Sequence, residues 1–210
     1  TPFHIGRLGP RLEAAMESVW SGATEPDGFP RLLPLTGLAV REIMVLRACG
    51  RYLLQTGLPF SQAYMEGVLR TYPDIALQLF RLFERRLNPV HSAAARARTQ
   101  PLEDVIARHL EAVTSLDADR ILRGFLHVIR AIVRSNFWQT RDGANRPCLS
   151  FKLDSQAIPE LPLPRPLFEV FVYSPEVEAV HLRMAQVARG GIRWSDRRED
   201  FRTEILGLMK

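Results

Sequence analysis

The sequence has 210 residues, of which 46% are hydrophobic and 24% are charged. These values are typical of a chain with a buried core and exclude wholesale disorder. The formal net charge is +5 at pH 7, and the basic residues are nearly all arginine, since the only lysines are Lys152 and Lys210. The arginines alternate with acidic residues, as over 83–86 and 196–200. That pattern is typical of solvated helix faces, so no nucleic-acid partner is expected.

The two cysteines and five histidines are scattered, so neither a disulfide framework nor a metal site is expected. No apolar run reaches the length of about 18 residues that a membrane span needs, and the N-terminus lacks the apolar stretch of a signal peptide. The sequence therefore predicts a cytoplasmic protein without a membrane segment. Because it starts at Thr1 and ends at Lys210 inside an expected helix, we expect an internal piece of a longer chain.

The N-terminal part reads as a series of helices. A short amphipathic helix is predicted over 10–21, followed by a turn at 25–28 and a long helix over 36–55. Ser61 suits the N-cap of the next helix, which ends before Pro73.

Pro73 can itself open a further helix, which stops at Asn88–Pro89. Residues 90–100 are expected to be a linker or a frayed helix, and Pro101 starts another helix. Thr114 is the expected cap of the clearest helix of all. Its apolar residues follow a 3.6-residue period: Ile121, Leu122, Phe125, Leu126, Ile129, Ile132 and Val133.

The pattern changes near Asn136. Apolar and polar residues alternate over 149–154, which predicts a strand, and a proline-rich connector follows over 159–166. A buried strand is expected over 167–173. Because helices and strands are segregated, the predicted class is α+β. It comprises a helical domain over 1–136 and the first strands of an α/β substrate domain over 137–210, where a last helix runs from about Arg198.

One short motif could bind an anion: Arg189-Gly190-Gly191-Ile192-Arg193. Two glycines at the end of a strand allow a ligand to approach the backbone, and arginine forks match a carboxylate or a phosphate. The residues alone favour a plainer interpretation, a glycine turn with surface arginines. An RNA-binding Arg-Gly-Gly element is disfavoured, because such elements come as repeats in disordered sequence. No dinucleotide fingerprint, P-loop or zinc-protease motif is present.

The run from Val187 to Lys210, VARGGIRWSDRREDFRTEILGLMK, resembles the entry into the catalytic domain of the large bacterial NAD-dependent glutamate dehydrogenases. Upstream pieces at 27–29, 82–86 and 116–123 are similar to that family as well. The resemblance therefore covers most of the chain. It implies a parent enzyme that converts L-glutamate to 2-oxoglutarate and ammonia while NAD accepts a hydride, and that is homo-oligomeric.

The resemblance also implies site residues. Smaller glutamate dehydrogenases carry a Lys-Gly-Gly-x-Arg element whose lysine contacts a substrate carboxylate, and here Arg189 stands in the place of that lysine. The expected substrate-binding residues are Arg189, Gly190, Gly191, Arg193 and Lys210. Arginine presents a planar fork where lysine presents a point charge, so the contact must differ in geometry.

The family's catalytic lysine, its partner aspartate and the NAD-binding domain are expected beyond Lys210, so the chain alone should be inactive and should contain no catalytic or NAD-binding residue. The carboxylates Asp196, Glu199 and Asp200 are expected to pair with neighbouring arginines rather than to act as a base. The alternative function is a non-catalytic helical module with a structural or regulatory role, for which Arg189 would not affect substrate use.

Overall fold

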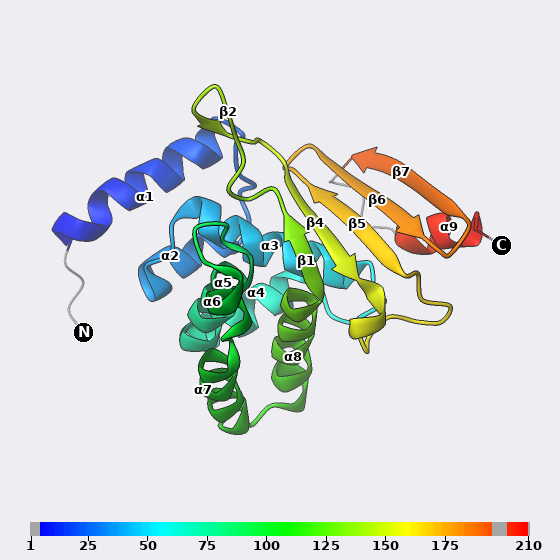
Figure 1. Cartoon of the computed structure of the whole chain (residues 1–210). Coiled ribbons are helices and arrows are strands. Elements are labelled where there is room, and N and C mark those ends of the chain that lie inside the picture. The colour runs from blue at the N-terminus through cyan, green and yellow to red at the C-terminus, as the bar shows by residue number, and fades with distance from the viewer. Residues whose placement is uncertain (1–4, 195–200, 210) are drawn as a thin grey trace.

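The structure is a computed structural model that describes residues 5–194 and 201–209. A helical body is followed by a five-stranded sheet, and helices α1 and α9 lie at opposite ends of the molecule (Figure 1). The predicted α+β class is therefore confirmed. The helices are α1 (Ile5–Trp20), η1 (Phe29–Arg31), α2 (Leu32–Thr36), α3 (Val40–Leu54), α4 (Gln62–Thr71), α5 (Pro73–Leu87), α6 (Ala93–Ala97), α7 (Gln100–Glu111), α8 (Leu116–Ala131), η2 (Ser155–Ala157) and α9 (Phe201–Gly207).

Helices α3 and α8 form the centre of the helical body. Two glycines let them approach closely: a Cβ atom on Gly50 would lie 3.4 Å from the Phe125 ring, and one on Gly124 would lie 3.3 Å from Leu53. Phe125 and Leu53 are fully buried. Burial of such side chains contributes about 1.5–3 kcal/mol each, so this apolar contact stabilises the packing of α3 against α8.

The sheet is antiparallel throughout, in the order β1-β4-β5-β6-β7, and a small hairpin of β2 and β3 lies apart from it. The strands are β1 (Ile132–Ser135), β2 (Thr140–Arg141), β3 (Ala144–Asn145), β4 (Leu149–Asp154), β5 (Phe168–Tyr173), β6 (Val177–Arg183) and β7 (Ala188–Trp194). Alternate residues of β4 and β5 are buried, such as Phe151 opposite Phe171. That face packs on the helical body, and α3 contacts both strands.

Several element boundaries differ from those predicted. The expected helix over 36–55 is interrupted at Gly37, which adopts φ +72° and ends α2 before α3 begins. Ser115, not Thr114, caps α8 by accepting a hydrogen bond from the Ala118 N–H. Ile132 is buried as the stripe predicts, but it opens β1 instead of continuing the helix, since β-branched residues favour strands.

The glycine pair differs from the prediction in a way that matters for the site. Gly190 and Gly191 lie in the middle of β7, paired with His181 and Val180 of β6, rather than in a turn at the end of a strand. Strand β7 is an edge strand of the sheet, and α9 packs against it and against β6. The motif is therefore part of a flat sheet edge, and its arginines take the orientations that the strand dictates.

Candidate functional site

Strand β7 presents Arg189, Gly191 and Arg193 on the same side, because successive strand residues alternate between faces. Their cross-strand partners are Leu182, Val180 and Glu178. These partners are buried, so this side of β7 continues the face of the sheet that packs on the helices.

The two arginines nevertheless have opposite environments. Arg189 is exposed, and its Nη1 donates to the carbonyl of the neighbouring Ala188 at 3.0 Å. Arg193 is only 9% exposed, and its Nη2 donates to Glu178 Oε2 at 2.7 Å. The guanidinium of Arg193 also lies over the Phe201 ring, 5.7 Å from its centroid, which is cation–π distance. Arg189 can therefore meet a ligand at the surface, whereas Arg193 is committed to the interior.

The glycines serve close packing on the two faces of β7. A Cβ atom on Gly191 would lie 2.6 Å from the Phe201 ring and 2.9 Å from Ile205, so the absence of a side chain lets α9 sit on the strand. A Cβ atom on Gly190 would lie 2.9 Å from the carbonyl oxygen of Val180. Neither glycine has a positive φ, so both are required for space rather than for backbone conformation.

Glu178 is the carboxylate that fixes Arg193, and it has a second arginine partner from the helical body. Arg51 of α3 donates from Nε to Glu178 Oε1 at 2.6 Å. Arg51 also donates to the Gln62 side chain at 3.0 Å and lies 3.5 Å from Glu25. Burial raises the pKa of Glu25, and the neighbouring Arg51 and Arg47 oppose that rise. Strand β7 is thus tied through one buried glutamate to helix α3.

A second buried carboxylate, Glu169 of β5, also joins an arginine of the C-terminal part to a side chain of α3. Arg202 of α9 donates from Nε to Glu169 Oε2 at 2.9 Å, and the hydroxyl of Tyr52 donates to the same oxygen, also at 2.9 Å. The backbone N–H of Arg202 donates to the Gln55 side chain at 3.1 Å. Burial raises the pKa of Tyr52, so its hydroxyl stays protonated as a donor. Helix α9 is therefore also held by α3.

Sequence reasoning missed Glu178, Glu169, Arg51 and Tyr52. A signal was available for the two glutamates, because they occupy inward positions of strands β5 and β6, in step with the buried Phe171 and Val180. A charged residue at an inward position needs a buried partner. The expected contact at Lys210, and the expected pairing of Asp196, Glu199 and Asp200, lie outside the described residues.

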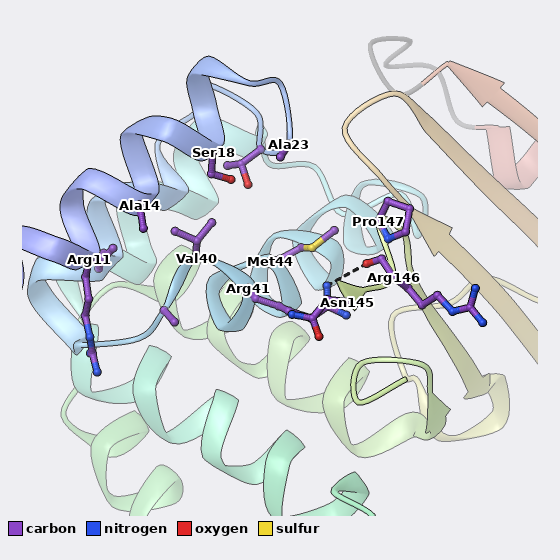
Figure 2. A pocket seen from close by; sticks show the side chains of 13 residues that line it. Arg11, Ala14, Ser18, Ala23, Val40, Arg41, Met44, Asn145, Arg146 and Pro147 are labelled. Atoms are coloured by element: carbon purple, nitrogen blue, oxygen red, sulfur yellow. Dashed lines mark hydrogen bonds between the residues drawn. The ribbon is translucent and has the colours of Figure 1, made fainter. Parts of the chain in front are cut away.

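A separate cavity of about 430 Å³ lies between α1, the start of α3 and the turn after β3 (Figure 2). Arg41 lies at this cavity and donates to the carbonyls of Arg146 and Phe137, each at 3.0 Å. Burial lowers the pKa of Arg41. The Arg146 side chain points away from the cavity and contributes only its backbone there (Figure 2). Two backbone carbonyls thus already accept hydrogen bonds from the Arg41 guanidinium. This cavity is therefore a weaker candidate for a ligand site than strand β7.

Within 5–194 and 201–209, no cluster of three or more His, Cys, Asp or Glu side chains is arranged to bind a metal. In the same part of the chain, no helix is both long enough and apolar enough to cross a bilayer.

The candidate site is thus the edge strand β7, which carries an exposed arginine and two glycines. Buried ion pairs connect this strand and α9 to the rest of the fold. Residues 105–210 match the family described as bacterial NAD-glutamate dehydrogenase, catalytic domain, and residues 24–89 match glutamate dehydrogenase, helical motif 3. The chain belongs to the bacterial NAD-glutamate dehydrogenases.

Relatives named NAD-specific glutamate dehydrogenase agree with this assignment. The protein of Mycobacterium tuberculosis is 48% identical over 203 residues, which are 95% of this chain and 12% of the relative. The protein of Pseudomonas aeruginosa is 46% identical over 210 residues, which are 98% of this chain and 13% of the relative. That of Halomonas elongata is 43% identical over 203 residues, or 96% and 12%. The chain thus spans about an eighth of the length of these relatives.

Proposed function

We propose that this chain supplies part of the substrate pocket of an NAD-dependent glutamate dehydrogenase, which converts L-glutamate, NAD and water to 2-oxoglutarate, ammonia and NADH. Residues 137–210 would form the start of the substrate domain, and the helical domain over 1–136 would support it. The NAD-binding domain and the catalytic lysine would come from other parts of the full-length enzyme. NAD would accept the hydride there. We expect that enzyme to be a cytoplasmic homo-oligomer.

The observation that carries the proposal is the exposed guanidinium of Arg189. Among the residues that the structure describes, no carboxylate pairs with Arg189, whereas Arg193 and Arg202 are bound by buried glutamates. An exposed arginine on the rim of a packed sheet can bind a substrate carboxylate through two parallel hydrogen bonds. Gly190 would let the substrate approach the strand, and Lys210 would add positive charge to the pocket. Gly191, which lies under α9, and Arg193, which is paired with Glu178, would support the pocket from inside the protein.

The test is glutamate-dependent reduction of NAD by a full-length enzyme that contains this segment. Arg189→Ala should raise the KM for glutamate about 10- to 100-fold, since a hydrogen bond to a charged group contributes about 1.5–3 kcal/mol. Arg189→Lys should retain part of the affinity, because the positive charge remains. A matched control is Arg183→Ala, which removes an exposed arginine from the other face of the neighbouring strand β6.

Arg183→Ala should leave the KM unchanged. Wild-type kinetics in a folded Arg189→Ala enzyme would remove the carboxylate role. The helical body would then be better explained as a structural or regulatory module.

A further inference from the structure

The C-terminal end of α3 turns three polar side chains toward the sheet: Arg51 and Tyr52 of the last turn, and Gln55, which follows as the C-cap residue. Each contacts a different element of the C-terminal part, namely β6 through Glu178, β5 through Glu169 and α9 through the backbone of Arg202. Arg51, Tyr52 and Gln55 are at most 7% exposed. One end of one helix therefore fixes the strands and the helix that surround the glycine pair.

Glu178 connects α3 to β7, because it accepts hydrogen bonds from Arg51 of α3 and from Arg193 of β7. Both of its oxygens are used, Oε1 by Arg51 at 2.6 Å and Oε2 by Arg193 at 2.7 Å. The Glu178 side chain is 1% exposed, and hydrogen bonds between charged groups gain strength where water is excluded. Arg51 lies in the segment that matches helical motif 3, whereas Glu178 and Arg193 lie in the segment that matches the catalytic domain.

Strand β7 needs such an anchor because it lies at the edge of the sheet. It has hydrogen-bonded pairing with β6 on one side. Its two glycines add no side chain that could pack, and glycine lowers the rigidity of a strand. Arg193 and Arg189 lie four residues apart on the same side of this strand, a span of roughly 13 Å. Rotation of β7 at Arg193 would therefore redirect Arg189.

We propose that Glu178 is a positioning residue for glutamate binding: it clamps Arg193 of β7 to Arg51 of α3 and thereby aims Arg189 at the substrate carboxylate. The inference rests on the proposed function and adds to it a role for the helical body. In this arrangement Arg193 acts inside the protein, and Arg189 is the arginine that meets the substrate.

The test is a double-mutant cycle in the full-length enzyme, with Glu178→Gln and Arg189→Ala made singly and together. Glu178→Gln keeps the shape of the side chain and removes its charge. It should raise the KM for glutamate about tenfold, since loss of alignment by an ångström can cost as much or more. In the Arg189→Ala background the same change should raise the KM by less than about twofold, because there is no guanidinium left to misalign.

The matched control is Asp119→Asn, which neutralises a carboxylate that pairs with Arg123 on the surface of α8. It should leave the KM unchanged. If Glu178→Gln does not fold, Arg51→Lys is the milder variant. It keeps the charge but loses the planar fork that reaches Glu178 and Gln62 together, and it should show the same dependence on Arg189.

Thermal unfolding of each variant separates positioning from general destabilisation. A lower Tm with a wild-type KM would overturn the proposal, as would an equal rise in KM with and without Arg189. If Arg189→Ala itself leaves the KM unchanged, the proposed function fails first, and the inference fails with it.

Discussion

The two sides of helix α3 dock by different chemistry. Toward α8 the contact is apolar and close, with Gly50 against Phe125 and Leu53 against Gly124. Toward the sheet, Arg51 and its neighbours add buried hydrogen bonds and ion pairs to the edge-on contact of the Tyr52 ring with Phe171. Both sides are buried to a similar degree, so burial alone does not tell them apart.

The difference teaches what each interface contributes. Apolar burial stabilises without strong directional preference. A buried ion pair adds little net stability, because the loss of hydration offsets the attraction, but its hydrogen bonds are directional. The helical body thus supplies stability, while the polar side of α3 sets the position of β7 and α9. An enzyme that must hold a substrate carboxylate needs the second property.

The largest expected effect comes from breaking the pair at Glu169. Glu169→Ala removes the buried carboxylate that Arg202 and Tyr52 share, and Arg202 is fully buried. Loss of one partner of a buried pair costs about 3–5 kcal/mol, because a charge is left without compensation. The free energy of unfolding of this chain, measured in urea, should fall by that amount.

A double replacement sharpens the comparison. Glu169→Leu with Arg202→Met exchanges the pair for apolar side chains of similar volume, and most of the lost stability should return. If the double variant is as unstable as Glu169→Ala, the polar side of α3 contributes net stability as the apolar side does. The distinction between the two sides would then be wrong.

A smaller effect is expected at Gly191, where α9 packs against β7. A Cβ atom there would lie 2.6 Å from the Phe201 ring, so Gly191→Ala must displace α9 and should destabilise the chain by about 1–3 kcal/mol. The control is Gly207→Ala in the same helix, where no atom lies within 4 Å of the added Cβ. That variant should match or exceed wild-type stability, since alanine favours helix by about 1 kcal/mol.

If the two glycine variants behave alike in thermal unfolding, packing at Gly191 does not hold α9 on the sheet. The hydrogen bonds of Glu169 and Gln55 to Arg202 would then be the contacts to test next.

The sequence predicts the apolar side of this architecture well. The stripe of α8 from Ile121 to Ile129 is visible as a period of 3.6, and strand β4 is visible as an alternation over 149–154. These patterns are local, because each records which side of one element is buried. The α+β class and the order of the elements follow from them.

The polar side could not be predicted in the same way. Arg51 and Glu178 are 127 positions apart, and Tyr52 and Glu169 are 117 apart, so no local period links them. The mid-strand position of Gly190 also depends on tertiary packing rather than on local propensity. The motif at Arg189 was found, but which of its two arginines faces solvent depends on Glu178.

The smallest effect is expected for Glu25, which lies before α3 in the chain and 3.5 Å from Arg51 of that helix. Burial raises its pKa above the ordinary value, with Arg51 and Arg47 opposing that rise. The folded state therefore binds a proton at Glu25 more readily than the unfolded state does. The stability that this proton contributes is fully present below the unfolded pKa and is lost as the pH rises through the folded pKa.

Glu25→Gln removes this titration. The difference in unfolding free energy between wild type and Glu25→Gln should therefore shift in favour of wild type as the pH falls from 7 toward 4. The same change at the exposed Glu176 serves as the control for the loss of a carboxylate at the surface. A shift in the opposite direction would mean that the arginines outweigh burial at Glu25. The ion pairs of α3 would then stabilise the fold outright, and its two sides would differ in chemistry but not in thermodynamic role.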